Sequence, residues 1–108
     1  MELSVEKTAL LRTGLKVMAI QECNVLSVTP SQIDDHETVI GGTGALHLDS
    51  LDAVEIVTSI ERCFGIRFES PGESRQIFKS FTVMAEYVAE HAAEERVDQF
   101  IAKQKTGF

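Results

Sequence analysis

Residues 48–65, LDSLDAVEIVTSIERCFG, contain the strongest helical pattern of this chain. Apolar residues recur there at spacings of three and four, which places an apolar stripe along one side of a helix. The stripe consists of Leu51, Val54, Val57, Ile60 and Phe64. Asp49 is suited to cap this helix, because its carboxylate can accept a backbone N–H of the first turn. Gly65 can adopt the left-handed conformation that ends it. The stretch therefore predicts an amphipathic helix with the hydroxyl of Ser50 at its start.

The composition is that of one globular domain, with 108 residues of which 44% are hydrophobic. Seventeen acidic residues against ten basic ones give a net charge of −7. This charge disfavours nucleic acid and anionic membrane surfaces, and it favours basic partners. No apolar run reaches the length of a membrane span, and the N-terminal residues lack the basic start and apolar core of a secretory signal. Cys23 and Cys63 have no metal-site spacing, so we expect reduced thiols and a cytoplasmic location.

Another helix is predicted before residues 48–65, at residues 3 to about 22. Its broad apolar face includes Leu15 and Met18. Gly14 weakens the interior of this helix by about 1 kcal/mol relative to alanine. Because the apolar face is so broad, the helix is expected to pack against neighbouring helices.

The second half of the chain predicts two further helices. Pro71-Gly72 indicates a turn, after which residues 73–79 can form a short helix. Ser80 is placed to be the N-cap of a last helix. Residues 93–108 either extend that last helix or form a frayed tail. The predicted fold class is therefore all-α, a four-helix bundle of residues 1–92 with a long first loop and one short third helix.

The long first loop spans residues 23–48. Thr29-Pro30-Ser31-Gln32 predicts a small helical turn within it. The glycine-rich residues 41–44 lack both the preceding strand and the lysine of a phosphate-binding loop. We therefore expect flexible turns there and no nucleotide site.

Asp49-Ser50-Leu51, followed by Asp52-Ala53-Val54-Glu55-Ile56, resembles the modification site and second helix of acyl carrier proteins. The tripeptide alone is common, but together with Phe64-Gly65 and the flanking elements the resemblance covers roughly residues 3–92. In that family the serine carries a 4′-phosphopantetheine arm through a phosphodiester bond, and the thiol of the arm holds acyl groups as thioesters. The family also has a long folded loop before the serine.

The resemblance implies an acyl carrier, not an enzyme, with 4′-phosphopantetheine attached to Ser50. Its partners would be a phosphopantetheinyl transferase (a holo-carrier synthase), acyltransferases, ketosynthases or related enzymes of fatty acid, lipid or polyketide synthesis. Partner contacts are expected at Asp49, Leu51, Asp52, Val54, Glu55 and Glu61. An acyl-chain pocket is expected to be lined by Leu15, Met18, Val57, Ile60, Phe64, Met84 and Val88. We also expect a monomer without nucleic-acid partner, membrane insertion, catalytic site or metal site.

Other roles of Ser50 are weaker on chemical grounds. No Gly-x-Ser-x-Gly elbow surrounds it, and the carboxylates of Asp49 and Asp52 would oppose a developing oxyanion. The same two carboxylates disfavour noncovalent phosphate binding at the helix start. Two alternatives stay open, namely a peptidyl or aminoacyl carrier and a helical interaction module that is never modified.

Four features depart from the carriers of primary fatty-acid synthesis. Glu61-Arg62-Cys63 stands where a run of acidic residues is common, Thr58 where a larger apolar residue often sits, and His47 where glycine is frequent. The chain also continues beyond residue 92. These differences favour a specialised carrier for a secondary lipid, polyketide or related pathway.

Overall fold

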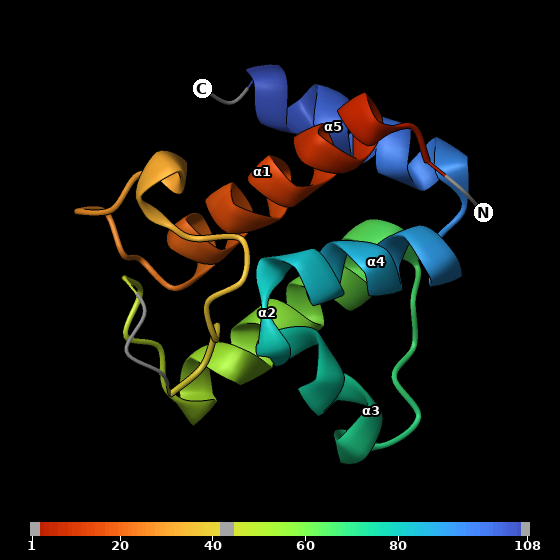
Figure 1. The fold of residues 1–108 in the computed structure, drawn as a ribbon. Helices are drawn as coiled ribbons and strands as arrows, with labels where there is room; N and C mark the ends of the chain where they lie inside the picture. The colour runs from red at the N-terminus through yellow and green to blue at the C-terminus, as the bar shows by residue number, and fades with distance from the viewer. Residues whose placement is uncertain (1–2, 42–44, 107–108) are drawn as a thin grey trace.

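The structure is a computed structural model that describes residues 3–41 and 45–106. Its helices are α1 (Val5–Glu22), α2 (Ser50–Phe64), α3 (Pro71–Gln76), α4 (Phe81–His91) and α5 (Glu94–Thr106), with the 3₁₀ helices η1 (Pro30–Gln32) and η2 (Ile77–Lys79). Figure 1 shows them as one bundle, and the predicted all-α fold class is confirmed. Across the described ranges, no helix has the length and apolarity needed to cross a membrane.

The two ends of α2 form as the sequence predicts. Asp49 Oδ1 accepts the backbone N–H groups of Leu51 at 3.0 Å and Asp52 at 3.1 Å. Asp52 Oδ2 in turn accepts the N–H of Asp49 at 3.0 Å, which completes a reciprocal capping box. At the other end Gly65 has a φ of 69°, and its N–H donates to the carbonyl of Glu61. A side chain is strained at such a φ, so glycine ends the helix most easily.

The apolar residues of α2 divide between two environments. Ile60 and Phe64 are buried in the core, together with Ile56, which the three-and-four pattern did not include. Leu51 and Val54 are instead 76% and 62% exposed. The core also contains Leu11, Leu15 and Met18 of α1 and Phe81, Met84 and Val88 of α4. The N-terminal part of α2 thus presents two large apolar side chains to solvent.

The C-terminal stretch forms a fifth helix that packs against α1 and α2 (Figure 1). It does not continue α4, because the backbone becomes extended at Ala92, with φ −93° and ψ 151°. Val97, Phe100 and Ile101 are buried in the common core. The Phe100 ring lies against that of Phe64 with centroids 4.7 Å apart. Glu94–Thr106 is therefore a separate helix of the bundle and not an extension of α4.

The third helix begins earlier than the sequence suggested. Pro71 and Gly72, expected as a turn, are the first two residues of α3. Ser70 caps them, since its hydroxyl accepts the N–H of Glu73 at 3.2 Å. Proline suits the first helical position, because its φ is preset and its missing N–H would have no partner there. The expected turn at this point is therefore corrected to a capped helix start.

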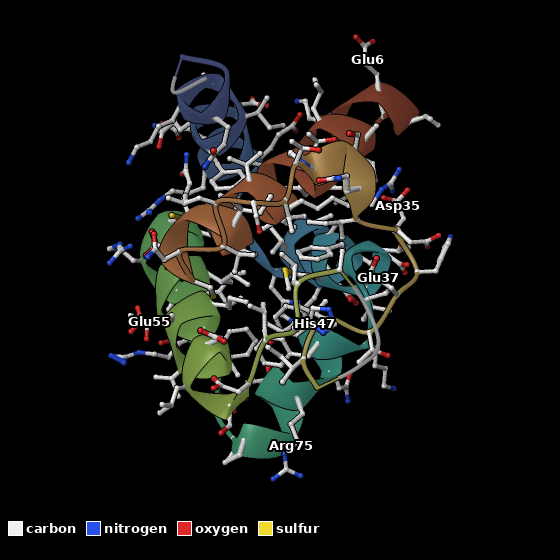
Figure 2. The ribbon with its side chains drawn as sticks, turned by 90° about the vertical axis from the view of Figure 1, so that its left-hand side faces the viewer. Glu6, Asp35, Glu37, His47, Glu55 and Arg75 are labelled. Atoms are coloured by element: carbon white, nitrogen blue, oxygen red, sulfur yellow. The ribbon has the colours of Figure 1, made fainter. Side chains whose placement is uncertain are left out.

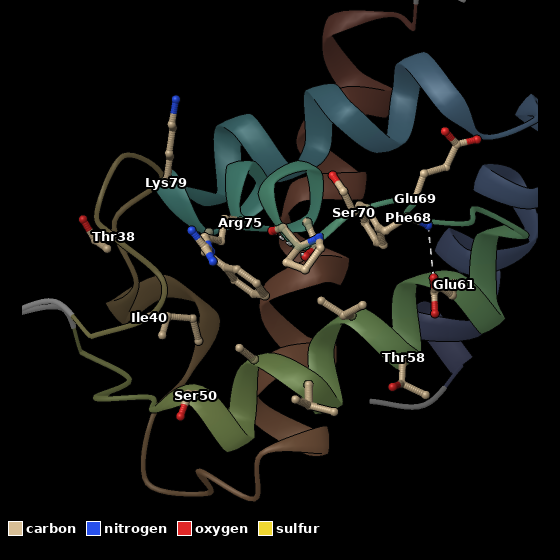
Figure 3. A pocket seen from close by; sticks show the side chains of 16 residues that line it. Thr38, Ile40, Ser50, Thr58, Glu61, Phe68, Glu69, Ser70, Arg75 and Lys79 are labelled. Atoms are coloured by element: carbon tan, nitrogen blue, oxygen red, sulfur yellow. Dashed lines mark hydrogen bonds between the residues drawn. The ribbon is translucent and has the colours of Figure 1, made fainter.

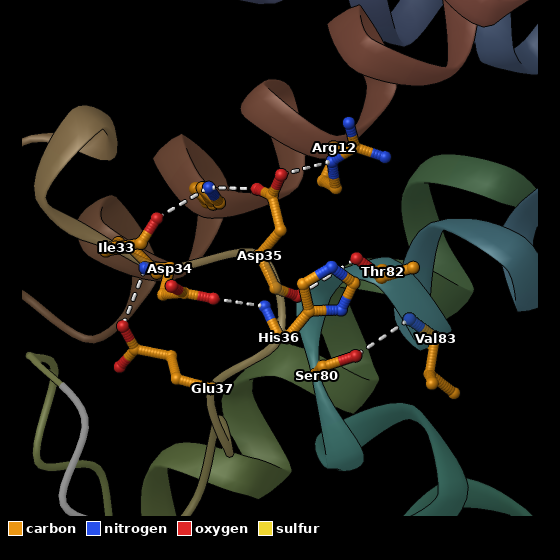
Figure 4. Close-up of polar contacts among 10 residues, drawn as sticks. Arg12, Ile33, Asp34, Asp35, His36, Glu37, Ser80, Thr82 and Val83 are labelled. Atoms are coloured by element: carbon orange, nitrogen blue, oxygen red, sulfur yellow. Dashed lines mark hydrogen bonds and ion pairs between the residues drawn. The ribbon is translucent and has the colours of Figure 1, made fainter.

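The long connection between α1 and α2 is joined to the bundle through Asp35 (Figure 4). The buried ammonium group of Lys16 donates to Asp35 Oδ1 at 2.5 Å and to the carbonyl of Ile33 at 2.7 Å. Arg12 Nε pairs with Asp35 Oδ2 at 3.2 Å. The Asp35 carbonyl accepts the N–H and the hydroxyl of Thr82 at the start of α4. The hydrogen bond from Lys16 lowers the pKa of the Asp35 carboxyl.

The same connection contains the small helical turn that the sequence predicts, as η1. The N–H of Thr29 donates to Gln32 Oε1 at 2.8 Å, which fixes the entry to this turn. The rest of the loop is attached to the core by buried apolar side chains, which are those of Ile33, Val39, Leu46 and Leu48. The prediction of flexible turns without a nucleotide site concerns residues 41–44, and residues 42–44 lie outside the described ranges.

Candidate functional site

Ser50 is the first residue of α2, and its side chain is exposed. Because Asp49 supplies the capping oxygen, the Ser50 hydroxyl is not needed for the helix start. It forms no hydrogen bond with any other described residue. A free hydroxyl at a rigid helix start can be reached by another protein without unfolding of the bundle.

An open groove with a volume of about 1010 Å³ begins at Ser50 and lies between α2 and α3 (Figure 3). Its apolar lining consists of Ile40, Ala53, Val54, Val57, Phe68, Pro71 and Phe78. Its polar lining, besides Ser50, consists of Thr38, Thr58, Glu61, Glu69, Ser70, Ser74, Arg75 and Lys79. Concave, mainly apolar surfaces with a few polar groups are typical of small-molecule sites. A flexible chain attached at Ser50 would start at the edge of this groove.

The predicted pocket residues do not come together at this groove. Val57 alone among them lines it. The others are buried in the core, and they are Leu15, Met18, Ile60, Phe64, Met84 and Val88. Sequence reasoning missed Phe68 and Phe78, which are half-buried groove residues. Their positions in the sequence were a usable signal. Both aromatic residues flank a short helix that has no apolar stripe, so that helix could not be expected to bury them completely.

The four acidic residues predicted for partner contacts have different roles. Asp49 and Asp52 hold the cap of α2, and the N–H of Asp52 lowers the pKa of the Asp49 carboxyl. Glu61 Oε2 accepts the N–H of Phe68 at 3.1 Å and fixes the chain after the helix. Glu55 is exposed, makes no hydrogen bond with a described residue, and projects outward from α2 in Figure 2. Glu55 is therefore the acidic side chain of this set most available to a partner.

The apolar members of the predicted contact set are available as well. Leu51 and Val54 are two of the most exposed large hydrophobic side chains of the described residues. They lie one and four positions after Ser50 on the same helix. Exposed apolar side chains that gather into a patch are typical of protein contact surfaces.

The structure shows the local environment of two positions at which the sequence differs from the acyl carrier pattern. His47 has a φ of 51°, a left-handed conformation that glycine adopts without strain. At the C-terminus of α2, Arg96 of α5 donates to the carbonyls of Arg62 at 3.4 Å and Cys63 at 3.3 Å. A cation there also interacts favourably with the helix dipole. Arg62 itself pairs with Glu22 of α1 at 3.7 Å. The C-terminal end of α2 is thus held by residues of α5 and α1.

Comparisons with protein-family models, curated proteins and solved structures found no match for this chain.

Proposed function

We propose that this protein is an acyl carrier whose 4′-phosphopantetheine arm is attached to Ser50. The observation that carries the proposal is an exposed hydroxyl that bonds no described residue, at the start of a capped helix and at the edge of an apolar groove. A structural first-turn serine would need neither the separate aspartate cap nor the groove. The chain itself would catalyse nothing, since the thioester chemistry belongs to the arm and to partner enzymes.

Attachment is a phosphoryl-type transfer from a donor that carries phosphopantetheine in a phosphoanhydride, such as coenzyme A. The new bond joins Ser50 Oγ to the phosphorus of the arm. The phosphoanhydride bond breaks, the nucleotide half of the donor leaves, and the hydroxyl proton passes to a base of the transferase. Because the transferase supplies that base, the carboxylates near Ser50 need not activate the hydroxyl.

The groove supports an acyl cargo in particular. An apolar chain on the arm would gain about 25 cal/mol for each Å² of apolar surface that it buries. The lining offers aliphatic and aromatic side chains on both walls, for example Val54 and Val57 on α2 and Phe78 on η2. The flexible arm would also raise the local concentration of the cargo at each partner site.

The exposed side chains beside Ser50 favour partners whose binding surface is basic and also contains apolar residues. Leu51 and Val54 are exposed, and Glu55 carries a free negative charge. Charge-steered, weak binding would suit a carrier that must leave each partner after one transfer. We further propose that the carrier acts as a monomer in the cytoplasm, in a specialised lipid or polyketide pathway.

Co-expression with a transferase of broad specificity tests the proposal. Intact-protein mass spectrometry should show the addition of one phosphopantetheine to the wild-type chain and none to Ser50→Ala. Ser27→Ala is the matched control, because Ser27 is another exposed serine of this chain and should leave the addition unchanged. A wild-type chain that stays unmodified, with several transferases, would contradict the carrier function and favour an unmodified interaction module. Loading by an amino-acid-activating enzyme would favour the aminoacyl carrier.

A further inference from the structure

The basic side chains of this acidic chain are mostly engaged in structural contacts. Ion pairs of described residues engage Lys7, Arg12, Lys16 and Arg62. Arg96 donates to the end of α2. Among the described side chains, Arg67, Arg75 and Lys79 make no hydrogen bond or ion pair with another residue, and two of these three line the groove beside Ser50. Within the part of the chain whose side chains are described, two of the three basic groups without an internal partner therefore lie at the groove.

The groove is also polarised along its length. In Figure 3, Ser50, Arg75 and Lys79 lie toward one end, while Glu61 and Glu69 lie toward the other. Neither Glu61 nor Glu69 forms an ion pair with Arg75 or Lys79 among the described residues, so the two cations have no acidic partner within the groove. Lys79 points away from Ser50 in this view, whereas the Arg75 guanidinium lies on the side of Ile40. Arg75 is thus the cation best placed for a ligand that enters from Ser50.

We infer that the groove accepts an acyl group that bears a carboxylate, with its methylene chain on the apolar lining and the carboxylate at Arg75. This inference rests on the proposed function, because the acyl group reaches the groove through the arm on Ser50. A guanidinium binds a carboxylate through two parallel hydrogen bonds, and it cannot lose its charge at physiological pH. The flexible ammonium of Lys79 adds a second positive charge without fixing the geometry.

A simple fatty acyl chain would use the apolar lining but would leave both cations without a ligand. The net charge of −7 makes this local cationic pair unusual for the chain, and charge complementarity therefore favours an anionic cargo. An acidic patch on a partner protein is the competing explanation, and so is the phosphate of the arm itself. A comparison of arms with and without a terminal carboxylate distinguishes these two ligands from a carboxylate on the cargo.

The test compares three forms of the full chain, each loaded enzymatically on Ser50 with hydrolysis-resistant amide analogues. These are the unacylated arm, a hexanoyl arm and an adipoyl arm of the same carbon count, which differs by its terminal carboxylate. Nitrogen-15 NMR follows the backbone amides of α3 and the side-chain Nε–H of Arg75. We expect the adipoyl form alone to shift the Arg75 Nε–H, and high salt to reduce this shift.

The variants sharpen the comparison. Arg75→Gln should lower the ratio of groove-bound to free adipoyl arm by about threefold to tenfold. This is the loss expected when one partly exposed, charged hydrogen bond is removed. The same variant should leave the hexanoyl form unchanged. Arg67→Gln is the matched control, since Arg67 is exposed, equally unpaired and outside the groove lining.

Each other outcome has a distinct meaning. Equal spectra for the adipoyl and hexanoyl forms would overturn the inference while leaving the carrier function intact. A shift of Arg75 in the unacylated form would assign the cation to the arm phosphate, and it would also overturn the inference. If Arg75→Gln weakens binding of a partner enzyme but not the adipoyl signal, Arg75 recognises that protein and the inference fails. Failure of Ser50 to accept any arm would overturn both proposals together.

Discussion

The ring of Phe100 lies so close to Gly14 that a Cβ added at Gly14 would stand 2.8 Å from its Cε2 atom. Gly14 is buried in the middle of α1, where glycine is otherwise unfavourable. The missing side chain lets α5 pack directly on the backbone of α1. This contact explains why a poor helix former stands at that position, and it shows that α5 belongs to the core.

Gly14→Ala should therefore destabilise the protein although alanine favours the helix. The gain in helix propensity is about 1 kcal/mol, whereas forcing an extra methyl into a packed contact costs about 1–3 kcal/mol. We expect a net loss of about 1 kcal/mol in the free energy of unfolding, measured with urea. Thr13→Ala, at an exposed neighbouring site of α1, should instead be neutral or slightly stabilising. Stabilisation by Gly14→Ala would show that the Phe100 contact yields easily.

Asp35→Asn should weaken the attachment of the long loop to α1 and α4. The buried Lys16 would lose its charged partner, and after allowance for the 38% exposed Asp35 side chain the loss should be about 1–3 kcal/mol. The folded pKa of Asp35 is lowered, chiefly by the hydrogen bond from Lys16, so this stabilisation is present above about pH 4 and is lost as pH falls through the lowered folded pKa.

Urea unfolding at several acidic pH values checks this expectation. The difference between wild type and Asp35→Asn should be largest near neutrality and should shrink in acid. Asp98→Asn is the control, because the exposed Asp98 shares Lys7 with Glu94, and its removal should change stability by less than about 0.5 kcal/mol. A constant difference across the pH range would contradict the proposed linkage.

The hydroxyl of Tyr87 donates to Glu73 of α3 at 2.5 Å, and this contact should be visible in alkali. Burial, followed by the hydrogen bond to Glu73, raises the pKa of Tyr87 to about 12. The stabilisation that comes from this raised pKa is fully present below about pH 10, the pKa of tyrosine in the unfolded chain. It is lost as pH rises through about 12, the pKa of Tyr87 in the folded protein. Because the chain has one tyrosine and no tryptophan, phenolate absorbance reports this group alone.

Glu73→Gln should lower the midpoint of that absorbance change toward the ordinary tyrosine range without reaching it, because the burial remains. Glu86→Gln, an exposed change elsewhere on the same helix as Tyr87, should leave the midpoint where it is. An unchanged midpoint in Glu73→Gln would mean that α3 is not held to α4 by this hydrogen bond in solution.

Leu51→Asp should slow modification of Ser50 without unfolding the protein. Leu51 is 76% exposed, so its loss from the folded chain changes stability by about 0.5 kcal/mol or less. An interface anchor of this kind commonly contributes more than 1 kcal/mol to binding, which predicts a fall of about tenfold in the initial rate of loading. Val5→Asp is the control, because Val5 is 88% exposed on a different helix. Equal loading rates for both variants would exclude Leu51 from the contact surface.

Cys23 should react slowly with thiol reagents in the folded protein. Its thiol lies near the Asp52 carbonyl, with Sγ 3.8 Å from the oxygen. Burial is the main cause that raises its pKa to about 12 from 9.0, which leaves about a thousandfold less thiolate at pH 8. In a Cys63→Ser variant, the remaining thiol should label slowly when folded and fully in denaturant. Rapid labelling of the folded variant would mean that the start of α2 opens readily.

Local sequence patterns were enough to predict most helix boundaries. Asp49 and Gly65 bound α2 in the structure because capping and left-handed termination depend on neighbouring residues alone. The same holds for Ser80, whose hydroxyl accepts the N–H of Val83 as the N-cap of α4. The start of α3 was misplaced because proline followed by glycine is compatible with both a turn and a helix start, and the choice depends on the Ser70 cap.

The lining of the groove could not be predicted in the same way. An apolar residue on a helix can face the core or a groove, and periodicity does not distinguish these environments. Ile60 and Val57 belong to the same apolar pattern, yet Ile60 is fully buried and Val57 lines the groove. The difference arises from where α3 and η2 lie relative to α2.

The sequence by itself determined that this chain is helical, that α2 begins at Ser50, and that acidic residues surround that serine. These properties follow from spacing, capping and composition, which act within a few residues. Tertiary structure alone decided that α5 packs on Gly14, that Leu51 stays in solvent, and that Arg75 lies in the same groove as Ser50. Such contacts join residues far apart in the chain, and they depend on how whole helices bury their apolar surfaces against one another.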